Sequence, residues 1–166
     1  MGRDFAEAFP ASREVYRLGS EVTGLDLEQI CFESPIEDLV ETEVQQPALV
    51  ATSLAILAAL RESGLEPDVV VGHSVGEFAA LAAAGVIGTG EAIGLVRERG
   101  LAMAEAARQR PGTMAAILGL EDEEVEKLCR KIVGVWPANY NCPGQIVISG
   151  EREAVEELCA EAESLG

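Results

Sequence analysis

The sequence is poor in histidine, and its few cysteines are scattered. A single histidine stands among 166 residues, and none of the four cysteines lies at Cys-x-x-Cys spacing from another. Structural and catalytic zinc sites are built from several closely spaced cysteine and histidine ligands. We therefore expect no metal site, and we expect the cysteines to be free thiols of the kind found in cytosolic proteins.

Positive charge is scarce as well. Lysine and arginine together number 12 against 29 acidic residues, so the net charge is −17. Nucleic acids and anionic membrane surfaces attract proteins of the opposite charge, so neither is an expected partner. Much of the acid lies at 121–126 and 151–163, where we interpret it as solvated helix surface.

Long apolar runs are also missing. The longest apolar helical pattern, residues 47–60, is interrupted by Thr52 and Ser53 and falls short of the roughly 20 residues that a membrane-spanning helix needs. Residues 1–5 lack the apolar stretch of a secretory signal. With 48% apolar residues, the chain can still bury a core. We expect a cytoplasmic protein without a membrane partner.

The first two thirds of the chain predict helices around one short buried strand at residues 68–73, which is β-branched and uncharged in its interior. The helices are expected at 3–19 (with a break at Pro10), 48–60, 75–84 and 91–107. Pro47 is expected at the first position of its helix, where the missing N–H costs nothing. Gly64 is expected to end that helix.

The last third predicts the order strand, helix, strand, strand, helix. One more strand would complete a ferredoxin-like split βαβ unit. The fold class is therefore α/β, with a partial α/β-hydrolase-like core at 1–111 and an incomplete ferredoxin-like (βαββα) subdomain at 112–166. The final helix reaches the end of the sequence, and we expect the chain to be part of a longer protein.

A serine stands where the predicted strand meets the next helix. Gly72-His73-Ser74-Val75-Gly76 matches the G-x-S-x-G nucleophile elbow, in which a sharp turn exposes the serine hydroxyl. The flanking glycines would relieve clashes in this turn. The N–H of Val75 could donate to an oxyanion, and the helix N-terminus adds partial positive charge. The alternative is that Gly and Ser merely cap a helix.

A serine nucleophile needs a base. His73 is the only histidine, but it directly precedes Ser74, and neighbouring residues of a strand point to opposite sides. We therefore predict that His73 supports the elbow by packing and hydrogen bonding rather than by accepting the serine proton. No histidine follows Ser74, so this chain alone is not expected to assemble a Ser–His pair.

One arginine interrupts an apolar helix face. Between residues 91 and 107, a stripe at helical spacing contains a single charge, Arg99. The other members of the stripe are Ala92, Leu95, Ala102, Met103 and Ala106. An inward guanidinium calls for a carboxylate, which the protein or a substrate could supply, and the pattern does not choose between them.

These motifs carry a family resemblance. Residues 72–81, followed by 84–87, closely resemble the elbow of malonyl-CoA:acyl-carrier-protein transacylases. Three further motifs stand in the family's order, namely Gln45–Leu49, Leu95–Gly100 and Asn139–Gly150. The resemblance runs over the whole chain without an evident gap.

The resemblance implies roles for individual residues. Ser74 would be the nucleophile that becomes malonylated, Arg99 would pair with the malonyl carboxylate, and the Val75 N–H would be an oxyanion donor. Gln46 matches a family glutamine near the site, and His73 matches the histidine before the nucleophile. The implied reaction moves malonyl from malonyl-CoA to the phosphopantetheine thiol of acyl carrier protein, in fatty-acid biosynthesis. It needs coenzyme A thioester as substrate and no bound cofactor.

The resemblance also implies missing parts. Family members begin with a strand and a Gly-Gln-Gly-Ser-Gln loop, and their catalytic histidine follows the ferredoxin-like insert. Neither segment is found here, so roughly half of a complete domain is present. Two alternatives stay open: a fragment of an α/β serine hydrolase or esterase, and a non-catalytic module that binds carrier protein. Arg99 favours the transacylase over the hydrolase, and the acidity of the chain counts against the module.

Overall fold

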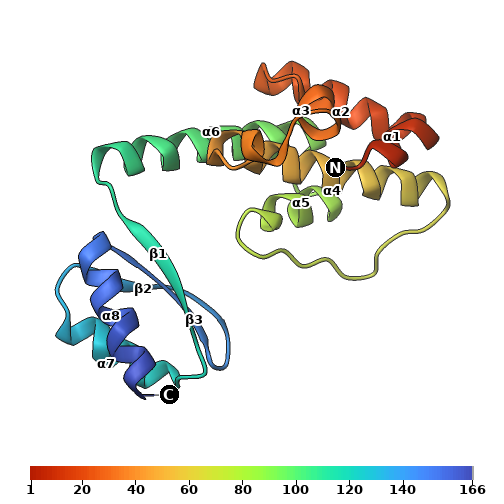
Figure 1. Ribbon diagram of the computed structural model, residues 1–166. Helices are drawn as coiled ribbons and strands as arrows, with labels where there is room; N and C mark the ends of the chain where they lie inside the picture. The colour runs from red at the N-terminus through yellow and green to blue at the C-terminus, as the bar shows by residue number, and fades with distance from the viewer. Residues whose placement is uncertain (166) are drawn as a thin grey trace. The chain divides into compact units, whose positions relative to one another are not determined.

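Two hydrophobic cores organise the chain. The computed structural model describes residues 1–165, and for Ile36 the backbone alone. The chain divides into two compact units, Met1–Glu105 and Ala106–Gly166. In Figure 1 the first unit runs from red to green, and the described part of the second runs from green through teal to blue. Each unit has its own cluster of buried apolar side chains, and the two clusters share no residue.

The first unit is helical. Pro10 is the first residue of a helix, so the predicted break there is confirmed. The elements are α1 (Arg3–Ala8), α2 (Pro10–Thr23), α3 (Leu27–Phe32), the 3₁₀ turn η1 (Ile36–Leu39), α4 (Thr42–Glu62), α5 (Gly76–Ala83) and α6 (Thr89–Gln109).

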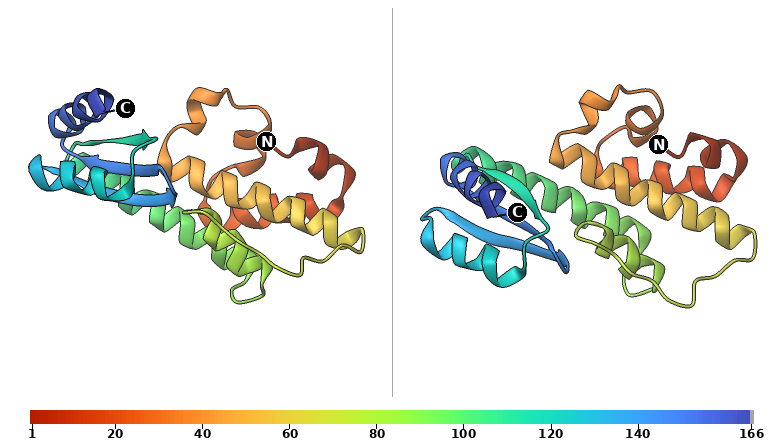
Figure 2. Two further views of the ribbon diagram at one scale, coloured as in Figure 1. Left: turned by 90° about the horizontal axis from the view of Figure 1, so that it is seen from below. Right: turned by 60° about the horizontal axis from the view of Figure 1, so that its bottom comes forward.

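Helix α4 forms the centre of this unit. It packs against α1, α2, α3 and α5, and Figure 2 shows it (yellow) running beside α2. Eight of its residues are buried, including the small residues Ala48, Ala51 and Ala55, which let neighbouring helices approach closely. By length and composition α4 is also the one helix among residues 1–165 that could cross a membrane, although buried core helices pass the same test.

The start of α4 differs from the prediction. The helix begins at Thr42, and Pro47 lies inside it. A proline at this position lacks the N–H that would donate to the carbonyl of Glu43 one turn earlier. Arg97 Nη1 donates to that carbonyl instead, at 2.6 Å, so the freed acceptor is satisfied. The helix ends as predicted near Gly64, whose φ of 79° continues the chain in the left-handed region.

The predicted strand at 68–73 does not form. The segment has no regular secondary structure, and Val69 and Val71 are 81% and 89% exposed. A strand exists only through hydrogen bonds to a neighbouring strand. The described part of the first unit contains no other strand, so these residues have nothing to pair with.

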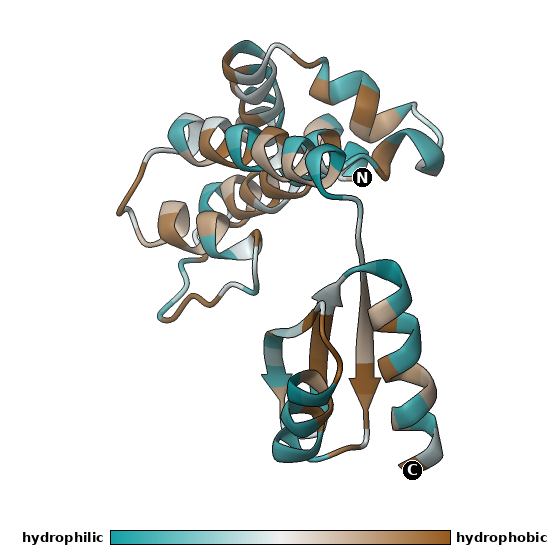
Figure 3. Cartoon of the chain, turned by 90° about the vertical axis from the view of Figure 1, so that its left-hand side faces the viewer, coloured by the Kyte–Doolittle hydropathy of each residue, from teal (hydrophilic) through white to brown (hydrophobic). Residues whose placement is uncertain are grey.

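The second unit has the predicted order of elements: β1 (Thr113–Leu118), α7 (Asp122–Lys131), β2 (Val135–Cys142), β3 (Gln145–Gly150) and α8 (Arg152–Leu165). The sheet order is β1-β3-β2, and both pairs are antiparallel. Ile117, Ile146 and Ile148 on one face of the sheet share a core with residues of α7 and α8. Figure 3 shows polar and apolar residues alternating along these two helices, as expected for helices with one buried face.

Candidate functional site

Ser74 sits in a strained turn. Its φ is +52°, the one positive φ of a residue other than glycine in the described chain. A left-handed backbone costs such a residue about 1 kcal/mol or more and is concentrated at functional positions. The turn is closed by the N–H of Gly76, which donates to the carbonyl of His73 at 2.9 Å, and by the N–H of Glu77, which donates to the carbonyl of Ser74 at 3.1 Å.

The two flanking glycines are not equivalent. A Cβ on Gly72 would lie 2.3 Å from the carbonyl atoms of Gly76 and 2.4 Å from the nitrogen of Glu77, so glycine is required there. A Cβ on Gly76 would meet no atom within 4 Å among the described residues beyond its chain neighbours and the backbone of its own helix. The expectation that glycine relieves a clash on both sides of the serine is therefore confirmed at Gly72 and wrong at Gly76.

The turn places the Ser74 hydroxyl next to the guanidinium of Arg99. The Ser74 side chain is exposed, and Arg99 Nη2 donates to its Oγ at 3.2 Å. Arg99 Nη1 donates to Oε1 of Gln46 at 2.6 Å. Three residues that are far apart in sequence, and that were singled out separately, thus form one connected group in the first unit.

Gln46 is itself held in place. It is 4% exposed, and its Nε2 donates to Thr42 Oγ1 at 2.7 Å and contacts Met103 Sδ at 3.2 Å. The thioether of Met103 can only accept and the guanidinium of Arg99 can only donate, so the amide nitrogen faces Met103 and Thr42 and the amide oxygen faces Arg99. A flipped amide would set an NH₂ group against the guanidinium, donor against donor.

The buried face of α6 differs from the predicted stripe. Leu95 and Met103 are 49% and 43% exposed, so the stripe through them is wrong in detail. The buried residues are Ala92, Ile93, Val96 and Gly100. A Cβ on Gly100 would lie 2.7 Å from the Cα of Glu43. Helix α6 thus approaches the start of α4 closely at a glycine, a residue that an apolar pattern does not count. Arg99, half-buried, lies next to this line.

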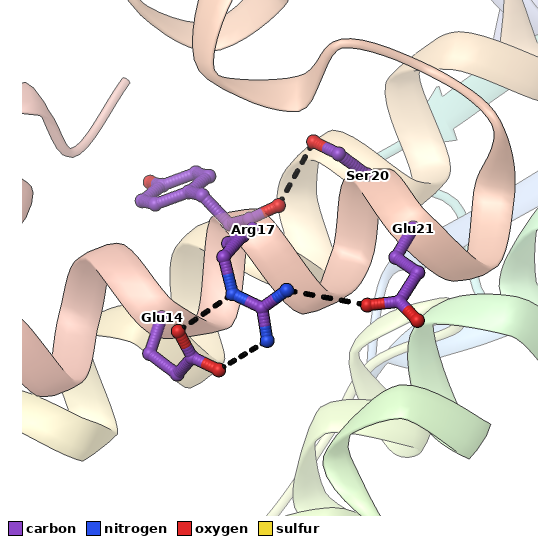
Figure 4. Close-up of polar contacts among 5 residues, drawn as sticks. Glu14, Arg17, Ser20 and Glu21 are labelled. Carbon is purple, nitrogen blue, oxygen red and sulfur yellow. Dashed lines mark hydrogen bonds and ion pairs between the residues drawn. The ribbon is translucent and has the colours of Figure 1, made fainter.

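No carboxylate in the described part of the chain neutralises Arg99. None of the ion pairs among residues 1–165 includes it, and its two acceptors, an amide and a hydroxyl, are uncharged. Arg17 on α2 shows the contrast (Figure 4): it donates to both carboxylate oxygens of Glu14, at 2.6 and 2.8 Å, and to Glu21 at 3.3 Å. The hydrogen bond from Arg17 lowers the pKa of Glu14. The question left open by the sequence is answered: the described protein supplies no carboxylate to Arg99.

The other predicted site residues have less defined surroundings. His73 is exposed, and its main-chain carbonyl belongs to the elbow turn; the support predicted from its side chain stays a prediction. Val75 stands immediately before α5, and the oxyanion role of its N–H also stays a prediction. Among residues 1–165, no three His, Cys, Asp or Glu side chains are grouped as metal ligands. All four cysteines are free.

Sequence reasoning missed Thr42, and it named Met103 only as an apolar member of the stripe around Arg99 and not as a partner of Gln46. Thr42 precedes Gln46 by one helical turn, and Met103 follows Arg99 by one turn, so each lies on the same helix face as a residue that was singled out. That spacing is the signal that could have found them once Gln46 and Arg99 were considered together.

Known proteins share this chain's sequence and structure. Residues 3–166 match the acyl transferase domain family. The malonyl CoA-acyl carrier protein transacylase of Bacillus subtilis (strain 168) is 42% identical over 160 residues, which are 94% of this chain and 50% of that protein. The protein of the same name from Staphylococcus aureus (strain MSSA476) is 38% identical, over 100% of this chain and 54% of its own length.

Solved structures of proteins with the same named function are also similar to this chain. The malonyl CoA-acyl carrier protein transacylase of Clostridium perfringens is 40% identical with a TM-score of 0.91, over 100% of this chain and 54% of that one. A malonyl-transacylase in complex with its type II PKS acyl-carrier protein also has 40% identity and a TM-score of 0.91, over 100% of this chain and 55% of its own. This chain spans about half the length of the curated relatives it matches. The chain belongs to the acyl transferase domain family.

Proposed function

We propose that this chain carries the serine-nucleophile part of a malonyl-CoA:acyl-carrier-protein transacylase that works in fatty-acid biosynthesis in the cytoplasm. The observation that carries the proposal is an arginine that has no counter-ion among residues 1–165 and whose Nη2 lies 3.2 Å from the oxygen of the candidate nucleophile. Such a guanidinium suits an acyl group that ends in a carboxylate. The relatives in Bacillus subtilis and Staphylococcus aureus are named for malonyl transfer to acyl carrier protein.

The proposed reaction has two halves. Ser74 Oγ attacks the thioester carbonyl of malonyl-CoA and loses its proton to a base, the C–S bond breaks, and the coenzyme A thiolate leaves with a proton. The phosphopantetheine thiol of acyl carrier protein then loses its proton to the base and attacks the carbonyl of the malonyl-serine ester, the ester C–O bond breaks, and the Ser74 oxygen regains a proton. Arg99 orients the free carboxylate, and the Val75 N–H stabilises the tetrahedral oxyanion.

The base is the part that this geometry does not supply. The single histidine directly precedes Ser74, and we assign it to support of the elbow. Gln46 belongs to the substrate-binding side through its contact with Arg99. No cofactor is required, because the reaction exchanges an acyl group between oxygen and sulfur without a change of oxidation state.

The finer description of the fold is part of the proposal. Residues 1–111 would be part of an α/β-hydrolase-like core, and 112–166 would be an incomplete ferredoxin-like subdomain. The order β1-β3-β2 with antiparallel pairs supports the second assignment, because three strands of a split βαβ unit arrange themselves this way. The division of the chain between Glu105 and Ala106 lies close to the proposed boundary.

Intact-protein mass spectrometry after incubation with malonyl-CoA tests the proposal, with Ser74→Ala as the control. A malonyl adduct on the wild-type chain alone would support it. The same measurement is then made after the remaining segments of the Bacillus subtilis relative are joined to this chain, which provides the base. If neither protein gains a Ser74-dependent adduct, the proposal is wrong. If acetyl-CoA labels Ser74 as readily as malonyl-CoA does, an ordinary serine hydrolase or esterase becomes the better description.

A further inference from the structure

The contact between Gln46 and Arg99 is short, and the side chain that contacts the arginine is uncharged. Oε1 of Gln46 lies 2.6 Å from Nη1 of Arg99, which is a short distance for an N–H···O bond. Gln46 is 4% exposed, so the contact is shielded from water on the glutamine side. A buried position this close to a guanidinium would ordinarily suit a carboxylate, because opposite charges attract strongly where water is excluded. The residue found there is the uncharged isostere of glutamate.

The environment of Gln46 fixes which end of the amide meets Arg99. Thr42 Oγ1 and Met103 Sδ take up the Nε2 side, and the oxygen is left for the guanidinium. The result is a positioned arginine with its positive charge intact. Arg17, held by Glu14 and Glu21, shows how this chain arranges an arginine whose charge is compensated.

We propose that Gln46 determines the charge selectivity of the acyl site, by holding the Arg99 guanidinium in place without neutralising it. Gln46 is thus a positioning and specificity-determining residue that acts through Arg99. Thr42 serves the same role one step further away, because it orients the amide. The inference rests on the proposed function, since it assumes that Arg99 receives the carboxylate of a malonyl group.

The inference predicts a change in selectivity rather than a general loss of binding. Gln46→Glu preserves the size and shape of the side chain. Thr42 can turn its hydroxyl to donate to a carboxylate, and Met103, which is 43% exposed, has room to move away. The new carboxylate would pair with Arg99 and repel the malonyl carboxylate. Malonyl-CoA should therefore bind at least about tenfold more weakly, while acetyl-CoA, which has no carboxylate, should bind within about twofold of the wild type.

Gln45→Glu is the matched control. It introduces the same charge one residue away on the same helix, at an exposed position that does not contact Arg99. It should leave the ratio of the two affinities within about twofold of the wild type. Thr42→Val is a second test that introduces no charge. Without its hydroxyl partner the amide is less firmly oriented, and the preference for malonyl-CoA should fall a few-fold. Circular dichroism melting curves verify that each variant is folded.

The measurement is the dissociation constant of malonyl-CoA and of acetyl-CoA, by isothermal titration calorimetry on the full chain, which requires no turnover. A wild-type preference for malonyl-CoA that Gln46→Glu removes and Gln45→Glu retains supports the inference. A preference that survives Gln46→Glu overturns the inference and leaves the proposed function standing. If Gln46→Glu does not fold, an unchanged preference in Thr42→Val overturns it. Equal affinity of the wild type for both thioesters contradicts the proposed function and the inference with it.

Discussion

Arg97 Nη1 lies 2.6 Å from the main-chain oxygen of Glu43, the carbonyl that Pro47 leaves without its helical donor. The proline inside α4 thereby creates an acceptor for a side chain of α6. Arg97 stands two residues before Arg99, and Pro47 directly follows Gln46. The bond thus ties α6 to α4 beside the contact between Arg99 and Gln46.

The first prediction concerns the coupling of these two residues. Arg97→Met should lower the free energy of unfolding by about 1–2 kcal/mol, because it leaves the Glu43 carbonyl without a donor. In a Pro47→Ala background the alanine N–H can supply the helical bond, and the same change should cost less than half as much. Urea denaturation of the four proteins measures the coupling. Equal costs in both backgrounds would show that the proline and the arginine act independently.

The second prediction concerns the close approach of α6 to α4. Gly100→Ala should destabilise the first unit by about 1–3 kcal/mol, because its Cβ would lie 2.7 Å from the backbone of Glu43 and the helices must move apart. Gly94→Ala in the same helix is the control. A Cβ there meets nothing within 4 Å, so the better helix propensity of alanine should stabilise the protein by up to ~1 kcal/mol. Thermal melts of both variants are the test, and a similar shift in both would refute the steric argument.

The third prediction concerns the elbow. Gly72→Ala should rearrange the turn, because its Cβ would overlap the backbone of Gly76 and Glu77, and Ser74 should then leave its positive φ. Gly76→Ala should keep the turn, since nothing obstructs a Cβ there. The backbone chemical shifts and the HN–Hα coupling constant of Ser74 report its φ directly by NMR. A Ser74 that keeps its resonance positions in the Gly72→Ala protein would contradict the expected clash.

The fourth prediction concerns alkaline pH. Burial raises the pKa of the Tyr16 hydroxyl to about 12, from a usual value near 10. Folding therefore disfavours the tyrosinate. The stability that this difference represents is fully present below pH ~10 and is lost as the pH rises toward ~12, by roughly 2–3 kcal/mol across that window.

The free energy of unfolding is measured by urea denaturation at pH values from about 8 to about 11.5, which cover most of that window. It should fall more steeply with pH in the wild type than in Tyr16→Phe. Burial also raises the pKa of the Cys31 thiol. The variant retains Cys31, so the difference between the two proteins reports Tyr16 together with its interaction with that thiol. Parallel curves for the two proteins would mean that Tyr16 titrates normally in the folded state.

The elements that sequence predicted well are those stabilised by their own periodicity and end signals. Helix α7 has a capping box, in which Glu121 and Glu124 cap each other's backbone N–H, and it stands at the predicted place in the order of elements. The segment 68–73 failed for the opposite reason. Its β-branched residues favour a strand, but a strand depends on a neighbour, and no local pattern reveals whether that neighbour is present.

The candidate site was predictable as a set of residues but not as an arrangement. Ser74 could be chosen from its elbow motif and Arg99 from its place on a helix. Their separation of 3.2 Å, and the link through Gln46, depend on how α4, α5 and α6 pack. Two residues influence that packing through what they lack: Pro47 has no backbone N–H, and Gly100 has no side chain. Neither absence produces an apolar periodicity that sequence analysis could detect.

The separate cores have a consequence for protein engineering. The hydrogen bonds of Ser74, Arg99 and Gln46 all join residues within 42–103, whereas β1, α7, β2, β3 and α8 surround a core of their own. We therefore expect the segment from residue 113 to 165 to be exchangeable as a unit. Chimeras that take this segment from another family member should preserve the contacts among Ser74, Arg99 and Gln46. Comparing their substrate preferences would then measure what the small sheet contributes to substrate choice.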